Sequence, residues 1–298
     1  MSRTLSASTN KPYGVARVAR VWDVARSSFY AARSRAASAV VPLKRGPKTD
    51  FTDEQLTDHI RTVIQKSPFF GEGHRKIWAR LRLAGIRTSK RRVLRLMRAA
   101  ELLGPARRPA VVNSNPHAGT IISEQPNQLW GTDATAAVTM AEGQVTIFAA
   151  IDHCTAECVG IHAVKRATRF EALEPIRQGV RRYFGGFAAD IARGLAVRHD
   201  HGSQYMSDHF QKELAFLGIE SSPAFVRAPE GNGCAERFIR TLKENLLWVR
   251  YFKTIEELRQ ALLAFRETYN TTWLIERHGY LTPTEFRDKR LQPLANVA

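Results

Sequence analysis

The stretch Leu129-Trp130-Gly131-Thr132-Asp133-Ala134-Thr135-Ala136-Ala137-Val138 has the character of a β-strand that carries one acid. A second strand-like run, Leu195-Ala196-Val197-Arg198-His199, ends at Asp200, just before a break at Gly202-Ser203. A third acid, Glu236, follows a glycine-rich segment at the start of a predicted helix. Carboxylates that hold hard divalent cations come from rigid elements that converge in space. We therefore expect Asp133, Asp200 and Glu236 to form one site.

The charge of the chain is concentrated in its N-terminal third. Residues 1–110 hold 24 Lys and Arg against 7 Asp and Glu, which accounts for the whole formal net charge of +17. The remaining residues hold 21 of each sign. This asymmetry is typical of a basic arm that grips a polyanion and is joined to a domain with another task. Charge alone leaves a ribosomal or RNA-binding role open beside DNA binding.

Three acids alone are weak evidence, because a chain with 28 Asp and Glu residues offers many such triples. The alternative interpretation is that they are solvated carboxylates and helix caps. The charge distribution favours a site, because the three acids lie in a region without net charge while the polyanion is gripped elsewhere.

The cysteines and the hydropathy indicate a soluble intracellular protein. Three cysteines do not build a disulfide framework and suit a reducing cytoplasm. No second ligand pair follows at zinc-finger spacing, so we expect buried thiols. The chain has no run of 18 apolar residues, and its N-terminus lacks the apolar region of a signal peptide. The residues considered as zinc ligands are His153, Cys154 and Cys158, and the third cysteine is Cys234.

Residues 11–33 carry the pattern of a small helical unit. The apolar stripe of its first helix comprises Val15, Val18, Val21 and Val24. A second helix is expected to begin near Arg26-Ser27-Ser28, which would place these residues at the start of a recognition helix. A helical hairpin without base contacts explains the pattern equally well. The following residues 34–50 lose the periodicity, and we interpret them as a basic linker that includes segment 44–48.

A second helical unit is expected from residue 52 onward. Thr52 and Gln55 form a capping box before a helix that runs to about Lys66. Two further helices are predicted over 73–83 and 89–102. One face of the last helix is almost entirely positive, whereas a merely solvated face normally mixes signs, so the pattern favours helix-turn-helix contact with DNA. The cations on this face are Arg91, Arg92, Arg95 and Arg98.

The rest of the chain alternates strands and helices after a linker over 105–116. Three strands in succession, followed by alternating helices and strands, predict an α/β fold with a mixed five-stranded sheet flanked by helices. A capping box is expected at Thr254 and Glu257. The strands are expected near 128–138, 144–153, 157–165, 194–200 and 219–225, and the helices near 169–184, 205–217, 231–248 and 255–270.

The chain resembles the second-frame transposases of the IS-three family of insertion sequences, whose catalytic core is related to retroviral integrases. Two departures are His199, where the family usually has Ser, and His201, where it usually has Arg. The resemblance spans nearly the whole chain and includes a helical unit over 71–102 that is similar to the family's second helix-turn-helix region. The matching segments are Pro126-Asn127-Gln128-Leu129-Trp130-Gly131-Thr132-Asp133, Asp200-His201-Gly202-Ser203-Gln204-Tyr205, Asn232-Gly233-Cys234-Ala235-Glu236-Arg237, Leu242-Lys243-Glu244, Tyr269-Asn270 and Leu281-Thr282-Pro283.

This resemblance implies a fold, an activity and partners. The core would be RNase H-like, with the three acids holding Mg²⁺ or Mn²⁺, two ions in all, for DNA strand cleavage and strand transfer. The partners would be insertion-sequence ends and target DNA, further copies of the chain, and a fusion partner from an upstream reading frame, in the nucleoid of a bacterial cytoplasm. The expected division is a helix-turn-helix-like segment with its linker (1–49), a second such domain (50–104), a linker (105–118), the core (119–290) and a tail (291–298).

The helix of Glu236 is expected to present one polar face to metal and DNA. Its members, Asn232, Glu236, Arg240 and Lys243, recur at helical spacing. The alternative for Arg240 and Lys243 is ordinary intrahelical pairing with Glu236 and Glu244, worth a few tenths of a kcal/mol.

Three other functions compete with a transposase. A catalytically inactive DNA-binding regulator explains the basic third but not the acids, and a nuclease of RNase H type does not require two basic helical units. A serine hydrolase is excluded, because Ser203, His199 and Asp200 lie too close along the chain and no nucleophile elbow is present.

Overall fold

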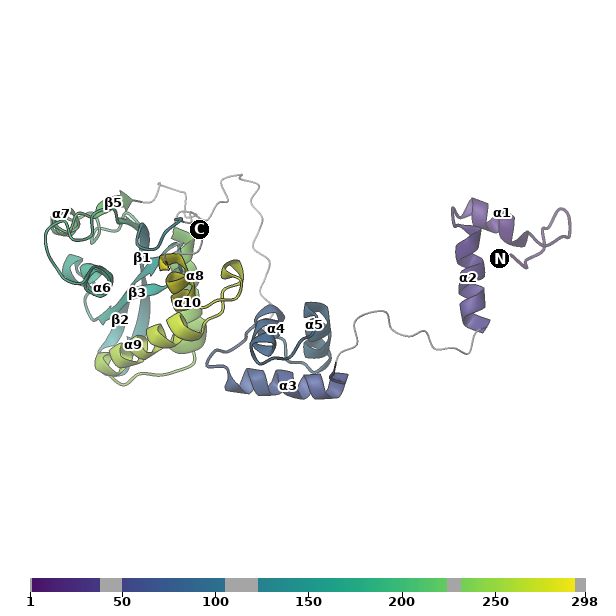
Figure 1. The fold of residues 1–298 in the computed structure, drawn as a ribbon, viewed down its shortest axis with the longest axis horizontal. Helices are drawn as coiled ribbons and strands as arrows, with labels where there is room; N and C mark the ends of the chain where they lie inside the picture. Colours follow the sequence, from purple (N-terminus) through teal and green to yellow (C-terminus); the bar gives the residue numbers. More distant parts are fainter. Residues whose placement is uncertain (1, 38–49, 105–122, 224–231, 293–298) are drawn as a thin grey trace, which may run out of the picture. The chain divides into compact units, whose positions relative to one another are not determined.

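The computed structural model describes residues 2–37, 50–104, 123–223 and 232–292 (Figure 1). The predicted linkers over 44–48 and 105–116, the tail residues 293–298 and the start of the glycine-rich segment at 230–231 lie outside these residues. The chain divides into two compact units, Met1–Asp50 and Phe51–Ala298. Within the described ranges, no helix is long and apolar enough to cross a membrane.

The first unit is a pair of helices, α1 (Gly14–Val21) and α2 (Arg26–Ala37). An antiparallel bridge between Leu5 and Pro12 precedes them. The second helix begins at Arg26 as predicted. The prediction of a continuous apolar stripe was wrong for its second half, because Val21 and Val24 are exposed and only Ala19 is buried in α1.

The second unit begins with three helices around a small core of their own: α3 (Asp53–Lys66), α4 (His74–Leu83) and α5 (Lys90–Ala99). The capping box is confirmed, since the Thr52 hydroxyl accepts from the Gln55 N–H and the Gln55 side chain accepts from the Thr52 N–H. α5 ends earlier than predicted because Glu101 adopts a left-handed conformation with a φ of 55°. The buried residues of this core are Leu56, Ile60, Ile77, Leu81, Ile86, Val93, Leu96 and Met97.

The loop between α3 and α4 fastens these helices to the rest of the unit. Phe69 is buried there and packs edge-on against Phe265 and Trp273. The backbone N–H of Phe70 donates to Asn245 Oδ1 at 2.8 Å. The contact therefore reaches the end of the helix that carries Glu236.

The sheet has five strands in the order β3-β2-β1-β4-β5. The strands β1 (Leu129–Thr139), β2 (Gly143–Asp152) and β3 (Cys158–Val164) are antiparallel neighbours. The short strands β4 (Ala196–His199) and β5 (Glu220–Pro223) run parallel to β1. The predicted mixed five-stranded sheet of an RNase H-like fold is confirmed.

Helices cover both faces of this sheet (Figure 1). Trp130, Ala134 and Phe148 pack on the side of α6 (Arg169–Phe184) and α7 (Asp208–Phe216). Ala137 and Ala149 pack on the side of α8 (Gly233–Leu242) and α9 (Ile255–Thr272). Because side chains alternate along a strand, Asp133 faces the same side as Ala137, toward α8.

Two local predictions about helices need correction. The helix expected over 231–248 is α8 followed by one π-helical turn, η2 (Lys243–Leu247). At the start of α9, the Thr254 hydroxyl accepts from the Glu257 N–H, but the Glu257 carboxylate accepts from the Lys253 N–H. The capping box predicted there is therefore only half formed, because the Glu257 side chain reaches one residue further back.

The C-terminal part contains elements that the sequence analysis did not predict, a short 3₁₀ turn η3 (Glu276–His278) and the helix α10 (Pro283–Leu291). Arg287 of α10 is buried and forms ion pairs with Glu157 and Asp152, and its guanidinium also donates to Asn127 Oδ1. Because Asn127 lies two residues before β1, this cluster holds the start of the strand that carries Asp133.

Candidate active site

Asp133 lies on a part of β1 whose second edge is open. β1 pairs with β2 along Trp130–Thr139, but it pairs with β4 only along Leu129–Gly131. From Thr132 to Val138 no described strand pairs with the β4 side of β1. Side chains bond the backbone beside Asp133 instead, because the Thr132 carbonyl accepts from Asn232 and the Ala134 N–H donates to Asp133 Oδ1.

The Asp133 carboxylate is half-buried and lies in an unfavourable electrostatic setting. The pKa of Asp133 is raised to about 6, mainly by burial and to a lesser extent by the carboxylates of Asp200 and Glu236, against the opposing effects of the Ala134 N–H and of Lys243. Desolvation and like charges both penalise an ionised carboxylate, whereas a bound cation would stabilise it. Asp200 and Glu236 thus lie within electrostatic range of Asp133.

Asp200 follows β4 directly and is exposed. Its Oδ1 accepts from the Gly202 N–H at 2.7 Å, so the break predicted at Gly202 is a tight turn that folds back on the carboxylate. A Cβ at residue 202 would lie 2.8 Å from that oxygen, which explains why glycine suits the turn.

His199 orients the backbone of Asp200. The His199 ring is buried, it stacks on Tyr205, and its Nδ1–H donates to the Asp200 carbonyl at 2.7 Å. Its Nε2 accepts from the Ser221 hydroxyl at 2.9 Å, and burial lowers the pKa of His199. The ring is therefore neutral and works through hydrogen bonds, while His201 is exposed.

Glu236 lies in the first turn of α8, and Asn232 holds the start of that helix. Asn232 is buried, and its side-chain N–H donates to the Thr132 carbonyl at 3.0 Å, next to Asp133. A Cβ on Gly131 would lie only 2.4 Å from Asn232 Oδ1. Because Asn232 is buried, its side chain is not available for the expected DNA contact. It instead positions the start of α8 against β1.

The remaining polar residues of this helix differ in how they are held. Arg240 is exposed and pairs with Glu244 at 2.8 Å, which is the intrahelical alternative. Lys243 is half-buried and close enough to Asp133 to favour its charged form. Lys243 is therefore the cation of α8 and η2 that acts on the candidate site.

The carboxylates of Asp133, Asp200 and Glu236 are suitable ligands for a hard cation, although their side chains do not converge on a common point. Among the described residues, no group of three or more His, Cys, Asp or Glu side chains lies at metal-binding distances. Asp133 Oδ1 instead accepts from the Ala134 N–H at 2.8 Å, as Asp200 does from Gly202. Carboxylate oxygens are the ligands that Mg²⁺ prefers, and each acid keeps one oxygen outside these turns.

The cations of α5 fall into two pairs. Arg92 and Arg95 bind Asp53 at 2.8 and 2.7 Å and so hold the start of α3. Arg91 and Arg98 are exposed, and within the described part of the chain they form no ion pair. Only the second pair has its full charge available to a polyanion.

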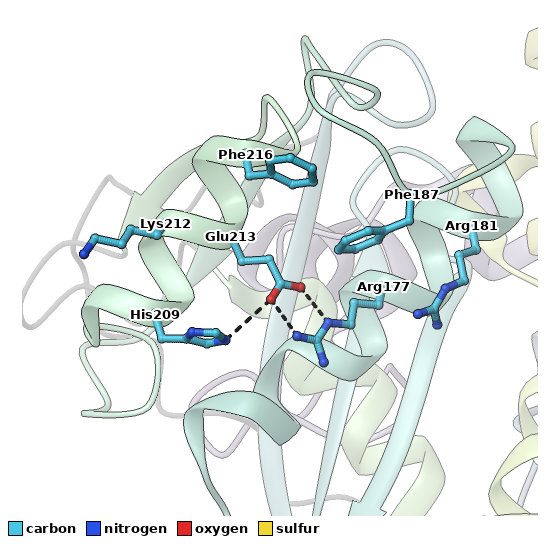
Figure 2. Close-up of a pocket in the computed structure, with 7 residues that line it drawn as sticks. All are labelled: Arg177, Arg181, Phe187, His209, Lys212, Glu213 and Phe216. Carbon is cyan, nitrogen blue, oxygen red and sulfur yellow. Dashed lines mark hydrogen bonds and ion pairs between the residues drawn. The ribbon is translucent and has the colours of Figure 1, made fainter.

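A groove of about 440 Å³ lies between α6 and α7, away from the candidate acids (Figure 2). Figure 2 shows the Glu213 carboxylate bound by Arg177, at 2.6 Å, and His209 close to the same carboxylate. Phe187 and Phe216 lie against each other at one end. Because the central charges neutralise each other, the groove has no acid free for metal chemistry.

The cysteines are buried free thiols, as predicted. Neither Gly131, which lies in the quoted strand, nor α10 was predicted from the sequence. A signal for α10 was present, because Thr282 and Glu285 form a capping box with Pro283 at the first helical position. No local pattern identifies Gly131, because its contact with Asn232 spans about 100 residues.

Family models match both parts of the second unit. An integrase core domain matches residues 123–229, a second integrase core domain matches 217–283, and an HTH-like domain matches 52–110. The chain is thus an integrase-core protein with an HTH-like domain ahead of the core.

Transposases of bacterial insertion elements are similar to this chain over most of its length. The chain is 28% identical over 286 residues to the transposase InsD for insertion element IS2A/D/F/H/I/K of Escherichia coli, covering 93% of this chain and 92% of the relative. InsD for IS2-9 of strain K12 is also 28% identical, with 93% and 90% covered. The chain is thus similar over nearly its whole length to transposases of insertion elements.

Solved structures of viral integrases are similar to the core. The catalytic core domain of BIV integrase is 20% identical, with 55% of this chain and 95% of that chain covered and a TM-score of 0.41. The HTLV-2 integrase catalytic core domain in complex with magnesium is 17% identical, with 55% and 98% covered and a TM-score of 0.42.

Proposed function

We propose that this protein binds insertion-sequence ends and catalyses metal-dependent DNA strand cleavage and strand transfer. The observation that best supports the proposal is that Asp200 and Glu236 lie close enough to Asp133 to act on its charge, although the three side chains do not converge on a common point. The match to integrase core models and the similarity to insertion-element transposases support the reaction class. An inactive regulator is not favoured, because it requires none of these acids.

Each residue has a role in this proposal. Asp133, Asp200 and Glu236 would hold two Mg²⁺ or Mn²⁺ ions, which activate a water or a 3′-hydroxyl and neutralise charge at the phosphate when bound. His199 holds the backbone of Asp200, and Asn232 fixes the first turn of α8 against β1. Lys243 would attract the phosphate beside the carboxylates, since cations that neutralise phosphates supply most sequence-independent affinity.

The substitution Asp200→Asn tests the catalytic part. We expect it to abolish Mg²⁺-dependent cleavage of a DNA end while end binding changes by less than about threefold, because an exposed amide keeps the hydrogen bond to the Gly202 N–H but not the charge. The matched control is Asp208→Asn, an exposed acid at the start of α7. Cleavage that survives Asp200→Asn would remove the assignment.

The helical part is proposed to bind DNA through the exposed cations of α5. Arg91→Ala and Arg98→Ala should each weaken binding and lower the slope of log affinity against log salt by about 0.9. Arg92→Ala should instead destabilise the domain, because Arg92 holds Asp53 and the Phe51 carbonyl. A salt slope unchanged in the Arg91 and Arg98 variants contradicts this interface.

We also retain the remaining expectations as proposals. These are the domain division at residues 49, 104, 118 and 290, assembly of several copies on DNA, fusion to a product of an upstream frame, and location at the bacterial nucleoid. The exposed Arg240 is retained as a DNA contact that would exchange its Glu244 partner for phosphate.

A further inference from the structure

One face of the strand β4 is partly open. Val197 and His199 of this strand are buried, whereas Ala196 and Arg198, which alternate with them, are only half-buried. Val197 packs in the core on the side of α6 and α7. Because side chains alternate along a strand, Ala196 and Arg198 lie on the opposite face of the sheet. Arg198 is therefore a cation on a partly exposed sheet face.

This face is the one that carries Asp133. β1 and β4 run parallel, and Gly131 is in register with Arg198. Asp133 is two residues beyond Gly131, so Asp133 and Arg198 point to the same side of the sheet, that of α8. Strands spaced about 4.8 Å apart, with about 3.3 Å per residue, place the Cα atoms of Asp133 and Arg198 roughly 8 Å apart. Asp200 directly follows the same strand two residues after Arg198 and acts on the charge of Asp133.

Ser222 holds the Arg198 side chain over this face. Ser222 of β5 is in register with Arg198, and Arg198 Nη2 donates to the Ser222 hydroxyl at 3.1 Å. Ser222 is itself half-buried, and Glu220, the other residue of β5 on this face, is exposed at the far end of the strand. The guanidinium is thus directed across β5 and not into the core. A guanidinium has five N–H donors in a fixed fork, so it can hold a hydroxyl and a phosphate oxygen at once.

Arg198 adds a cation to the candidate site from a second element. Lys243 acts on Asp133 from the turn that follows α8. Arg198 comes instead from β4, the neighbour of β1 on the side away from β2. DNA carries a negative charge at every nucleotide, and a strand held at the carboxylates is bound best where cations neutralise the adjacent phosphates. An arginine on the face of the acids meets this requirement, and its fork matches the geometry of a phosphate.

We propose that Arg198 binds a phosphate of the DNA strand that is cut, about two nucleotides from the phosphate at the carboxylates. The two residues that separate Arg198 from Asp200 span about 6.6 Å, and a DNA strand rises about 3.4 Å per nucleotide. Ser222 is the positioning residue that orients the guanidinium. The inference rests on the proposed function, because it takes DNA as the substrate at the carboxylates.

The test measures equilibrium binding of the full chain to a fluorescent insertion-sequence end in Ca²⁺, a cation that carboxylate oxygens bind. Arg198→Gln should weaken binding roughly 10-fold, the loss expected for one charge-assisted contact, and should lower the slope of log affinity against log salt by about 0.9. Arg198→Lys keeps the charge and should keep the salt slope. A neutral methylphosphonate at the contacted phosphate should weaken wild-type binding by a similar factor, yet Arg198→Gln should bind this DNA as well as unmodified DNA.

Arg193→Gln is the matched control, because Arg193 is an exposed arginine that precedes β4 at its other end and pairs with Asp190. Its DNA affinity should stay within twofold of wild type. Ser222→Ala leaves the guanidinium charged and should weaken binding by less than about threefold; a loss equal to that of Arg198→Gln shows that Arg198 only holds β5 and overturns the inference.

Two further results overturn it. One is an affinity of Arg198→Gln within twofold of wild type, and the other is a salt slope that falls in Arg198→Lys. The second result decides the question even if Arg198→Gln does not fold. Failure of the proposed function has a different sign, namely cleavage that survives Asp200→Asn.

Discussion

The contact between Gly131 and Asn232 yields a sharp test of how the carboxylates are positioned. An added Cβ on Gly131 would lie 2.4 Å from Asn232 Oδ1 and 2.6 Å from His153 Nε2. Ordinary carbon contacts are about 3.5–4.0 Å, so the neighbours of an alanine must move by about 1 Å. Asn232 connects the start of α8 to the Thr132 carbonyl, and this displacement is therefore passed to the first turn that carries Glu236.

Gly131→Ala is expected to lower the rate of metal-dependent strand cleavage by about 100-fold, because a misplacement of about 1 Å near reacting groups has this effect. Overpacking should also cost about 1–3 kcal/mol of unfolding free energy. Cleavage of a labelled DNA end under single-turnover conditions measures the first effect, and urea unfolding measures the second. Binding to the same DNA should change by less than about threefold.

Gly233→Ala is the matched control for Gly131→Ala. Gly233 is the first residue of α8, three residues before Glu236, and a Cβ there meets nothing within 4 Å. The control should keep wild-type cleavage. If Gly131→Ala cleaves within threefold of wild type and unfolds at the same urea concentration, Asn232 does not position the helix.

Three further predictions concern stability. Asp133→Asn should raise the unfolding free energy of the metal-free protein at pH 7.5 by about 1–3 kcal/mol, because burial and neighbouring carboxylates raise the pKa of Asp133 to about 6. A raised carboxyl pKa destabilises the folded state only where the carboxyl group is ionised. Thermal melts should therefore show that the stability advantage of Asp133→Asn over wild type shrinks as the pH falls from 6 to 4. A stability difference that stays constant over this range contradicts this origin. Arg287→Ala should cost about 3–5 kcal/mol in urea unfolding, because Glu157 is left buried without its partner; a loss below about 1 kcal/mol refutes the cluster's role. Phe69→Ala should lower the melting temperature and speed proteolysis of the α3–α4 loop, whereas Phe70→Ala, whose ring is exposed, should do neither.

The sequence by itself determined the elements and their order. Short runs with strand character predicted the strands, and capping residues marked the start of α3. The three candidate acids were also selected by local context, since Asp133 lies within a predicted strand, Asp200 ends another and Glu236 begins a predicted helix. These signals are local, so they need no knowledge of what packs against the element.

Only the tertiary structure decided which polar groups are free to act. Asn232 has the same helical spacing as Glu236, yet Asn232 is buried against β1. Arg92 lies on the same positive face as Arg91, yet Arg92 binds Asp53. Burial of a polar side chain depends on partners that are distant in the sequence, and local periodicity carries no information about those partners.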